Sequence, residues 1–283
     1  MAAVAHVETG SSRASGLARL GIDRARLVRA GTSAAVLLVS LGGILALWKW
    51  GSRAYGVPLL FPGPAEVADA FMDDLRKGDI TEAVGASLAR IVAGFTIGTL
   101  TGIVVGLLLG SSRVLCAMTA PLVTFFRFVP PLAWFGVVLV WFGAGESAKI
   151  VLIVYTSLFV VALNTMEGVA KVPQDMVRMA GVAGARTWQR LWMIVLPSSV
   201  PYIIAGARVA MGNAFMTVVS AEMLGASAGL GVIINNGMTS TAVPQVFAAI
   251  LILGFLGLGA DRLFMLLMNK AGTRLTYGRG EVA

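Results

Sequence analysis

The stretch EGVAKVPQDMVRMAGVAGARTWQRLWMIVLP, residues 167–197, is a polar, basic segment between two long apolar segments. Its charged residues are Lys171, Arg178, Arg186 and Arg190 against Glu167 and Asp175. A basic loop between membrane spans is expected on the cytoplasmic side. Gly184 divides the segment into two parts with helical character, which predicts two short helices joined by a turn. Since a loop that only reverses the chain needs a handful of residues, we expect this one to dock another molecule.

The composition around this loop is that of a membrane protein. Of 283 residues, 57% are hydrophobic and 13% are charged, whereas soluble domains have about a quarter charged residues. The net charge of +8 would suggest nucleic-acid binding in a soluble protein. Here the positive charges flank apolar segments, which points to membrane topology and anionic lipid headgroups and not to a nucleic-acid partner.

Six apolar segments are long enough to cross about 30 Å of hydrocarbon, which takes about 20 residues. They are residues 32–50, 88–109, 117–142, 148–166, 199–223 and 247–268. Pro130 and Pro131 interrupt the third segment. The pattern predicts an all-α membrane protein with about six transmembrane helices.

The distribution of basic residues predicts the orientation. Residues 1–31 are rich in arginine, which places this N-terminal segment in the cytoplasm and makes residues 32–283 the transmembrane domain. The apolar run after residue 31 is too long for a signal peptide, so we interpret it as an uncleaved first span. Six crossings return the C-terminus to the cytoplasm. The basic residues Lys270 and Arg274 near this end agree with the enrichment of Lys and Arg on the cytoplasmic side.

Two segments are expected on the outer side. Residues 64–75 have apolar side chains at helical spacing after Pro62-Gly63, which predicts a helix along the outer membrane surface. Residues 225–246 carry no charge and are rich in Gly, Ser and Asn. They predict a second outer loop, which either stays outside or dips back into the protein.

A glycine stripe runs along the second apolar segment. It consists of Gly94, Gly98, Gly102, Gly106 and Gly110, every fourth residue. This spacing places the glycines on one helix face, where another helix backbone can approach closely. Two interpretations stay open, a sliding or gating contact and simple tight packing.

No enzyme motif is present in the sequence. There is no GxxxxGK[ST], HExxH or GxSxG pattern, so we expect neither a nucleotide-binding loop nor an active site. Cys116 and His6 are each the single residue of their kind, which excludes an internal disulfide and the usual zinc sites. We expect no cofactor and no metal on this chain.

Polar residues within the apolar segments are candidates for a translocation pathway, because intramembrane charges usually face a cavity or a partner. The candidates are Arg127, Pro130, Pro131, Arg208, Asn213 and Glu222. Arg127 precedes the proline interruption, and an interrupted helix is where transporters often build sites. Arg208 and Glu222 are about 21 Å apart along one helix and cannot pair with each other. Either arginine attracts an anionic substrate, or each is held by a structural partner.

The basic loop resembles the motif by which permease subunits of ABC transporters receive the ATPase. That motif is Glu-Ala-Ala, three residues, Gly, nine residues, Ile, any residue, Leu-Pro. Gly184, Ile194, Leu196 and Pro197 match it, whereas Arg178-Met179-Ala180 stands in place of Glu-Ala-Ala. The docking residues that the resemblance implies are Arg178, Met179, Ala180, Gly184, Ala185, Thr187, Trp188, Ile194, Leu196 and Pro197.

Elementary chemistry agrees with this docking interpretation. Gly184 can adopt φ > 0, Thr187 can cap the second helix, and Trp188 with Leu191 and Trp192 offers an apolar face to a partner. The alternative is an amphipathic helix at the membrane surface that is held by lipid.

Further segments resemble the permeases for nitrate, sulfonate and taurine. They are residues 60–67 (LFPGPAEV), 87–90 (SLAR), 127–134 (RFVPPLAW) and 221–226 (AEMLGA). The resemblance implies a type I ABC importer permease that forms a homodimer in the bacterial inner membrane. It also implies two copies of a separate ATPase, which binds ATP and Mg²⁺, and a periplasmic or lipid-anchored substrate-binding protein. The substrate would be nitrate, a sulfonate, taurine, bicarbonate or a related organic acid.

Three alternatives stay open. An ion-coupled secondary transporter would need internal repeats and a membrane-embedded carboxylate, for which Glu222 is the candidate. A non-transporting membrane scaffold would use the basic loop only to recruit a partner. An ABC permease for a neutral or cationic substrate would share the architecture but not the use of the arginines.

Overall fold

The computed structural model describes residues 36, 38–57 and 59–276. Every regular element in this part of the chain is a helix, which confirms the all-α prediction. The chain divides into two compact units, one ending at Glu66 and the other beginning at Val67.

In the first unit, residues 38–55 form a helix. The predicted span 32–50 therefore lies partly in this helix, while residues 32–35 and 37 and the predicted cytoplasmic segment 1–31 lie outside the described residues. The chain after the helix folds back on it. The Trp48 indole donates a hydrogen bond to the Pro62 carbonyl at 2.9 Å, and the Ser52 hydroxyl donates to the Phe61 carbonyl at 3.0 Å.

The helix α2 (Pro64–Lys77) contains the division between the units, and the remaining elements belong to the second unit. These are α3 (Asp79–Gly110), α4 (Arg113–Phe128), the 3₁₀ turn η1 (Pro131–Trp134), α5 (Phe135–Phe142), α6 (Glu146–Ala170), α7 (Gln174–Val182), α8 (Thr187–Arg190), the π-helical turn η2 (Leu191–Val195), α9 (Leu196–Met223), α10 (Leu230–Thr239) and α11 (Val243–Thr276). The predicted amphipathic helix at 64–75 is confirmed by α2, and its position on the membrane stays a prediction.

Four helical stretches in the described part of the chain are long and apolar enough to cross a membrane. They are Asp79–Gly110, Glu146–Ala170, Thr187–Met223 and Val243–Met268, and they confirm the second, fourth, fifth and sixth predicted spans as helices. The third predicted span is bent by 88° between Val114–Phe128 and Pro131–Phe142. The bend lies at the predicted Pro130-Pro131 interruption, so this pair forms one broken span or a re-entrant loop.

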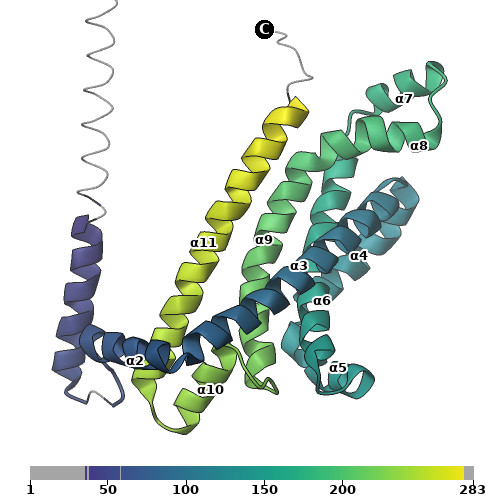
Figure 1. The fold of residues 1–283 in the computed structure, drawn as a ribbon. Helices are drawn as coiled ribbons and strands as arrows, with labels where there is room; N and C mark the ends of the chain where they lie inside the picture. The colour runs from purple at the N-terminus through teal and green to yellow at the C-terminus, as the bar shows by residue number, and fades with distance from the viewer. Residues whose placement is uncertain (1–35, 37, 58, 277–283) are drawn as a thin grey trace, which may run out of the picture. The chain divides into compact units, whose positions relative to one another are not determined.

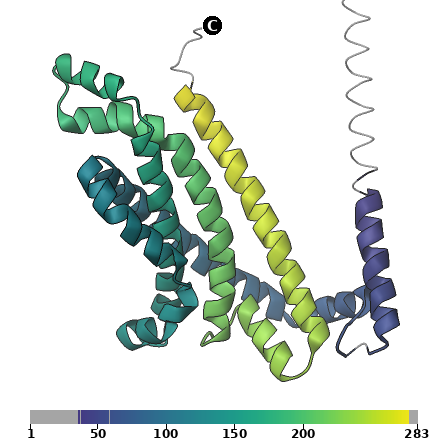
Figure 2. The same ribbon diagram turned by 180° about the vertical axis from the view of Figure 1, so that it is seen from behind.

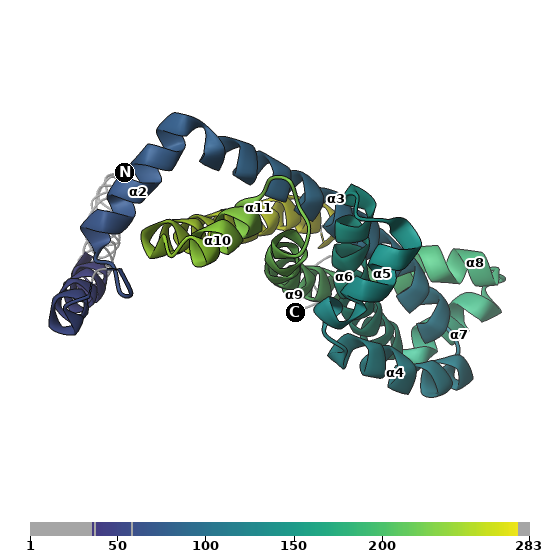
Figure 3. The same cartoon turned by 90° about the horizontal axis from the view of Figure 1, so that it is seen from below.

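The helix α6 supplies much of the core, and α3 and α9 both pack against it (Figures 1 and 3). Leu152, Ile153 and Val161 of α6 are almost completely buried. The glycine stripe of α3 faces α6 along its whole length. A Cβ atom at Gly98 would lie 2.7 Å from the Val154 carbonyl oxygen, which confirms the predicted close approach of a helix backbone.

The prediction of a loop at 225–246 is wrong, because residues 230–239 form the helix α10, which packs against α11. Leu230 and Ile234, one helical turn apart, are buried, and α10 also packs against α9 and α3. The Gly, Ser and Asn residues concealed this periodicity. Gly229, with φ of 146°, provides the backbone conformation at which the helix begins.

The second unit has two distinct ends. Figures 1 and 2 show α7 and α8 at the same end as the C-terminal part of α11, whereas α5 and α10 lie at the opposite end. The long helices α6, α9 and α11 connect the two ends, so the basic loop and the α9–α10 connection are separated by the length of the helices.

Candidate functional site

The basic loop folds into two short helices, α7 and α8, joined by a turn at Gly184. Gly184 has φ of 81°, which confirms the predicted positive φ. The Gly184 N–H donates to the Gly181 carbonyl at 3.0 Å, and the Ala185 N–H donates to the Ala180 carbonyl at 2.9 Å. These two bonds form a Schellman motif, which satisfies the last carbonyls of α7 and sets the direction in which the chain leaves it.

The prediction that Thr187 caps the second helix is wrong. The N-cap residue is Arg186, and Thr187 is the first helical residue. The Gln189 side chain accepts a hydrogen bond from the Arg186 N–H at 2.7 Å, while the Thr187 hydroxyl accepts from the Arg190 guanidinium at 3.2 Å. The return bond from Gln189 thus supplies the local order that we expected from a threonine cap.

The α7–α8 element, residues 174–190, exposes large apolar side chains. The exposed fractions are 64% at Met179, 92% at Val182 and 65% at Trp188. Trp188 makes an edge-to-face contact with Trp192, with ring centroids 5.2 Å apart. Exposed apolar side chains of this kind are compatible with an interaction surface.

The other predicted docking residues connect this surface to the long helices. Arg178 lies in α7, 4.0 Å from Asp175 of the same helix. Ile194 lies in η2, and Leu196 and Pro197 open α9. Residues 187–223 form one continuous 37-residue helical stretch. A displacement of Trp188 can therefore reach the middle of the unit through the helix itself.

Four of the six predicted pathway residues line one cavity. Arg127, Pro130, Pro131 and Asn213 meet around about 180 Å³ of space at the bend between α4 and η1. The remaining lining residues are Val129, Tyr155, Thr156, Phe159, Val160, Met216 and Thr217. This cavity therefore lies between the broken span, α6 and α9.

An aromatic cluster fixes the bend against α6. The Tyr155 hydroxyl donates to the Phe126 carbonyl at 2.5 Å, at the C-terminal turn of α4. Phe126 stacks on Phe159 with ring centroids 5.4 Å apart, and Trp134 contacts Tyr155. In the cavity wall, the Thr156 and Thr217 hydroxyls are hydrogen-bonded to each other at 3.1 Å, which joins α6 to α9.

Arg208, the fifth predicted pathway residue, has a carboxylate partner. Its guanidinium donates two hydrogen bonds to Asp261 of α11, at 2.7 and 2.8 Å. Arg208 and Asp261 line a second cavity of about 400 Å³ between α9 and α11. The ion pair offsets the charge of the arginine at this position.

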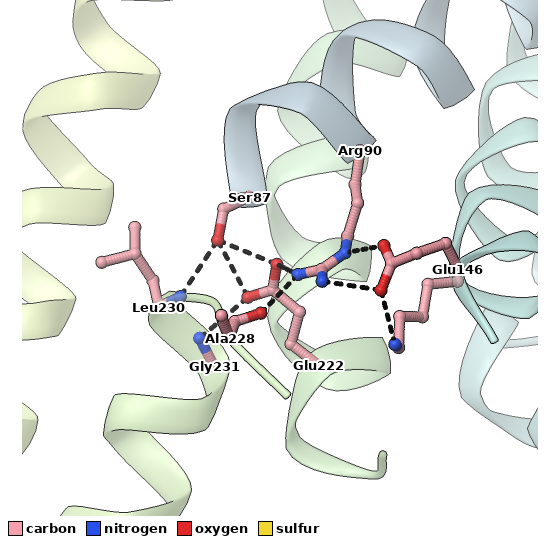
Figure 4. A network of polar contacts seen from close by, with 8 residues as sticks. Ser87, Arg90, Glu146, Glu222, Ala228, Leu230 and Gly231 are labelled. Carbon is pink, nitrogen blue, oxygen red and sulfur yellow. Dashed lines mark hydrogen bonds and ion pairs between the residues drawn. The ribbon is translucent and has the colours of Figure 1, made fainter. Parts of the chain in front are cut away.

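Glu222, the sixth predicted pathway residue, lies at the centre of a buried polar network (Figure 4). Its side chain is completely buried and pairs with Arg90 of α3 at 2.7 Å. The Ser87 hydroxyl and the Gly231 N–H donate to the same carboxylate, at 2.8–2.9 Å. The network joins α3, α9 and α10 and lines neither of the two cavities just described.

Arg90 extends the network to α6. Its guanidinium also donates to Glu146 and to the Ala228 carbonyl, and Lys149 donates to Glu146 at 2.9 Å (Figure 4). Arg90, Glu146 and Lys149 were not among the functional candidates expected from the sequence. The SLAR segment, residues 87–90, was the available signal, because it places Ser87 and Arg90 one helical turn apart.

Within the described residues, no group of three or more His, Cys, Asp or Glu side chains could hold a metal ion. The features together are those of a helical multi-pass membrane protein with exposed apolar side chains on a short helix pair at one end and a largely apolar cavity, lined by Arg127 and Asn213, at a broken span.

Comparison with known proteins defines the family. Residues 98–271 match the family described as binding-protein-dependent transport system inner membrane component. The chain is 31% identical to the taurine transport system permease protein TauC of Escherichia coli (strain K12), over 86% of this chain and 90% of TauC.

Two relatives from Synechococcus elongatus are similar over much of the chain. The bicarbonate transport system permease protein CmpB is 33% identical over 80% of this chain and 84% of CmpB. The nitrate import permease protein NrtB is 34% identical over 80% of this chain and 85% of NrtB. This chain belongs to the binding-protein-dependent inner membrane components, as an ABC importer permease of the nitrate and taurine family.

Proposed function

We propose that two copies of this chain form the translocation pathway of an ATP-driven importer for a small anion in the bacterial inner membrane. Two copies of a separate ATPase bind the α7–α8 elements and carry ATP and Mg²⁺. A periplasmic or lipid-anchored binding protein delivers the substrate from the opposite side. The chain itself catalyses no covalent reaction.

The observation that carries this proposal is the α7–α8 element. It is a short helix pair with a fixed turn and an exposed apolar surface at one end of the long helices. Exposed Met, Val and Trp side chains lose contact with water when a partner covers them, and a groove on the ATPase is the partner that we propose.

The continuous helix from Thr187 to Met223 supports a route for coupling. ATP binding closes the ATPase pair and moves the docked α8, and the motion passes through η2 into α9. Asn213, on α9, then moves relative to the broken span that carries Arg127. The cavity between them opens to the outside, and hydrolysis with product release returns it to the inward-facing state.

The proposed orientation places α7–α8 and both termini in the cytoplasm. It is supported by the basic residues of the loop and of the C-terminal region, as the positive-inside rule expects. The position of α7–α8 at the same end as the C-terminal part of α11 agrees with this orientation.

The anionic nature of the substrate is supported by the relatives, whose names specify taurine, bicarbonate and nitrate. A secondary transporter is less well supported. Its candidate coupling carboxylate, Glu222, is held by Arg90, Ser87 and the Gly231 N–H. A carboxylate whose oxygen atoms are already engaged by three donors is poorly placed to coordinate and release a coupling ion.

Purification in mild detergent, followed by mass spectrometry and an ATPase assay, tests the proposed function. We expect a P-loop ATPase to co-purify and to show vanadate-sensitive activity. A preparation without an ATPase, both in detergent and in nanodiscs, would contradict the proposal and would favour the transporter or scaffold alternatives.

The substitution Gly184→Val is expected to reduce the amount of bound ATPase about tenfold while the chain still inserts in the membrane. A β-branched residue at φ of 81° costs about 1–3 kcal/mol, and the turn relieves this strain by changing the direction of α8. The measurement is the ratio of ATPase to permease after affinity purification.

The matched control for this experiment is Gly181→Ala, three residues earlier on α7. A Cβ atom at Gly181 would meet only the Arg190 guanidinium at 3.6 Å, which is an ordinary contact. We expect this variant to retain the ATPase. Equal retention by Gly184→Val would show that the turn does not position the docking surface.

A further inference from the structure

Arg127 differs from the arginines that have structural partners. Arg90 and Arg208 each form an ion pair with a carboxylate. Arg127 is exposed in the last turn of α4, and its guanidinium lies 5.1 Å from the centroid of the Phe128 ring, a cation–π contact. No carboxylate within the described chain forms an ion pair with it. A charge that lines a membrane-protein cavity without a counter-ion attracts an ion of opposite sign.

Asn213 provides a second polar group in the lining of the same cavity, from a different helix. It lies on α9, and none of the hydrogen bonds of the described residues engages its side-chain amide. By contrast, the Thr156 and Thr217 hydroxyls are already bonded to each other. The Arg127 guanidinium and the Asn213 amide together offer N–H donors from two elements, which suits the several oxygen atoms of a carboxylate or a sulfonate.

The rest of the cavity wall is largely apolar. Beside Tyr155, Thr156 and Thr217, it consists of the apolar residues Val129, Pro130, Pro131, Phe159, Val160 and Met216. An inorganic anion could accept hydrogen bonds from Arg127 and Asn213, but it would gain no favourable contact from the apolar part of this wall. An organic anion with a short chain would bury apolar surface there, which stabilises the bound state by about 25 cal/mol per Å². A largely apolar pocket with a few polar groups is the usual form of a small-molecule site.

We propose that this cavity binds the transported solute as an organic anion, with the anionic group at Arg127 and Asn213 and a short carbon chain or ring against the apolar wall. This rests on the proposed function, which makes the cavity part of the pathway. Among the anions named for its relatives, the cavity would favour carboxylates and sulfonates that carry an apolar portion over nitrate and bicarbonate.

The test uses the full chain with its co-purified ATPase in nanodiscs. The probe is 1-butanesulfonate, whose binding is followed by saturation-transfer difference NMR with empty nanodiscs as background. We expect specific binding of butanesulfonate that nitrate displaces only at a large excess. Butyltrimethylammonium, which has the same chain and the opposite charge, should not compete.

Variants locate the site. We expect Arg127→Gln to weaken butanesulfonate binding at least about tenfold, because a neutral amide replaces the charged donor of the hydrogen bond. Arg127→Lys keeps the charge but loses the fork of donors, so it should bind with intermediate affinity. Arg53→Gln, a substitution of an exposed arginine in the first unit, should leave binding unchanged.

Three results would overturn the inference: no specific binding of butanesulfonate, equal competition by nitrate or by the cation, or unchanged binding by Arg127→Gln. The ATPase activity of the same nanodiscs separates this failure from failure of the proposed function. Vanadate-sensitive activity without butanesulfonate binding rejects the organic-anion site alone, whereas the absence of any ATPase rejects the importer.

Discussion

The substitution Glu222→Gln is expected to destabilise the fold by about 3 kcal/mol or more, because it removes one charge of a buried ion pair. The Glu222 carboxylate is completely buried and accepts hydrogen bonds from Arg90, Ser87 and the Gly231 N–H. A glutamine side chain has nearly the same size, but its NH₂ group would face some of these donors. Arg90 would keep only Glu146, which is half exposed, and the Ala228 carbonyl.

The measurement is the thermal unfolding midpoint in nanodiscs by intrinsic tryptophan fluorescence. The matched control is Asp73→Asn, which breaks an exposed ion pair with Arg76 at 3.8 Å on the surface of α2. Exposed pairs contribute little, so this control should melt close to the unsubstituted protein. An unfolding midpoint of Glu222→Gln equal to that of the control would show that the network does not hold α3, α9 and α10 together.

A double substitution separates the pair from its surroundings. When Arg90→Met is added to Glu222→Met, the combined loss of stability should be smaller than the sum of the two single losses. Each single variant breaks the buried pair and leaves the other charge with fewer partners, whereas the double variant removes both charges. Additive losses would indicate that each residue acts through other contacts.

The same network marks the limit of prediction from the sequence. The sequence shows that Glu222 and Arg208 are costly charges within apolar segments and that they are too far apart to pair with each other. Their partners, Arg90 and Asp261, lie on other helices, 132 and 53 residues away. Such partners depend on how the helices pack, and periodicity within one segment carries no information about that.

Predictions from the sequence succeeded for features that depend only on residues close together in the chain. Apolar length predicted the long helices, and the Pro130-Pro131 pair predicted the bend. Gly184 has the positive φ that its place between two helices required. Local rules failed at Thr187, because Gln189 made Arg186 the better cap, and at α10, where Leu230 and Ile234 needed a tertiary partner to define their buried face.

The substitution Gly98→Ala is expected to lower the unfolding midpoint, and Gly98→Leu is expected to prevent folding. A Cβ atom at Gly98 would lie 2.6 Å from the Ser157 Cβ and 2.7 Å from the Val154 carbonyl oxygen of α6. Both are closer than packed atoms allow, so α3 and α6 must separate. Overpacking by one methyl group in a tight core costs about 1–3 kcal/mol, and leucine adds three more carbon atoms.

The control for the glycine stripe is Gly85→Ala on the same helix. No atom lies within 4 Å of a Cβ atom at Gly85, and alanine favours the helical conformation more than glycine does, so this variant should melt at the same temperature or higher.

The comparison of Gly98→Ala with Gly85→Ala also separates the two interpretations of the glycine stripe. If the glycines allow α3 to slide on α6, Gly98→Ala should melt normally but change the ATPase turnover of the assembled transporter. If they serve tight packing, Gly98→Ala should lower the unfolding midpoint while ATPase turnover per folded molecule stays unchanged. The short distances at all five glycines support this second interpretation.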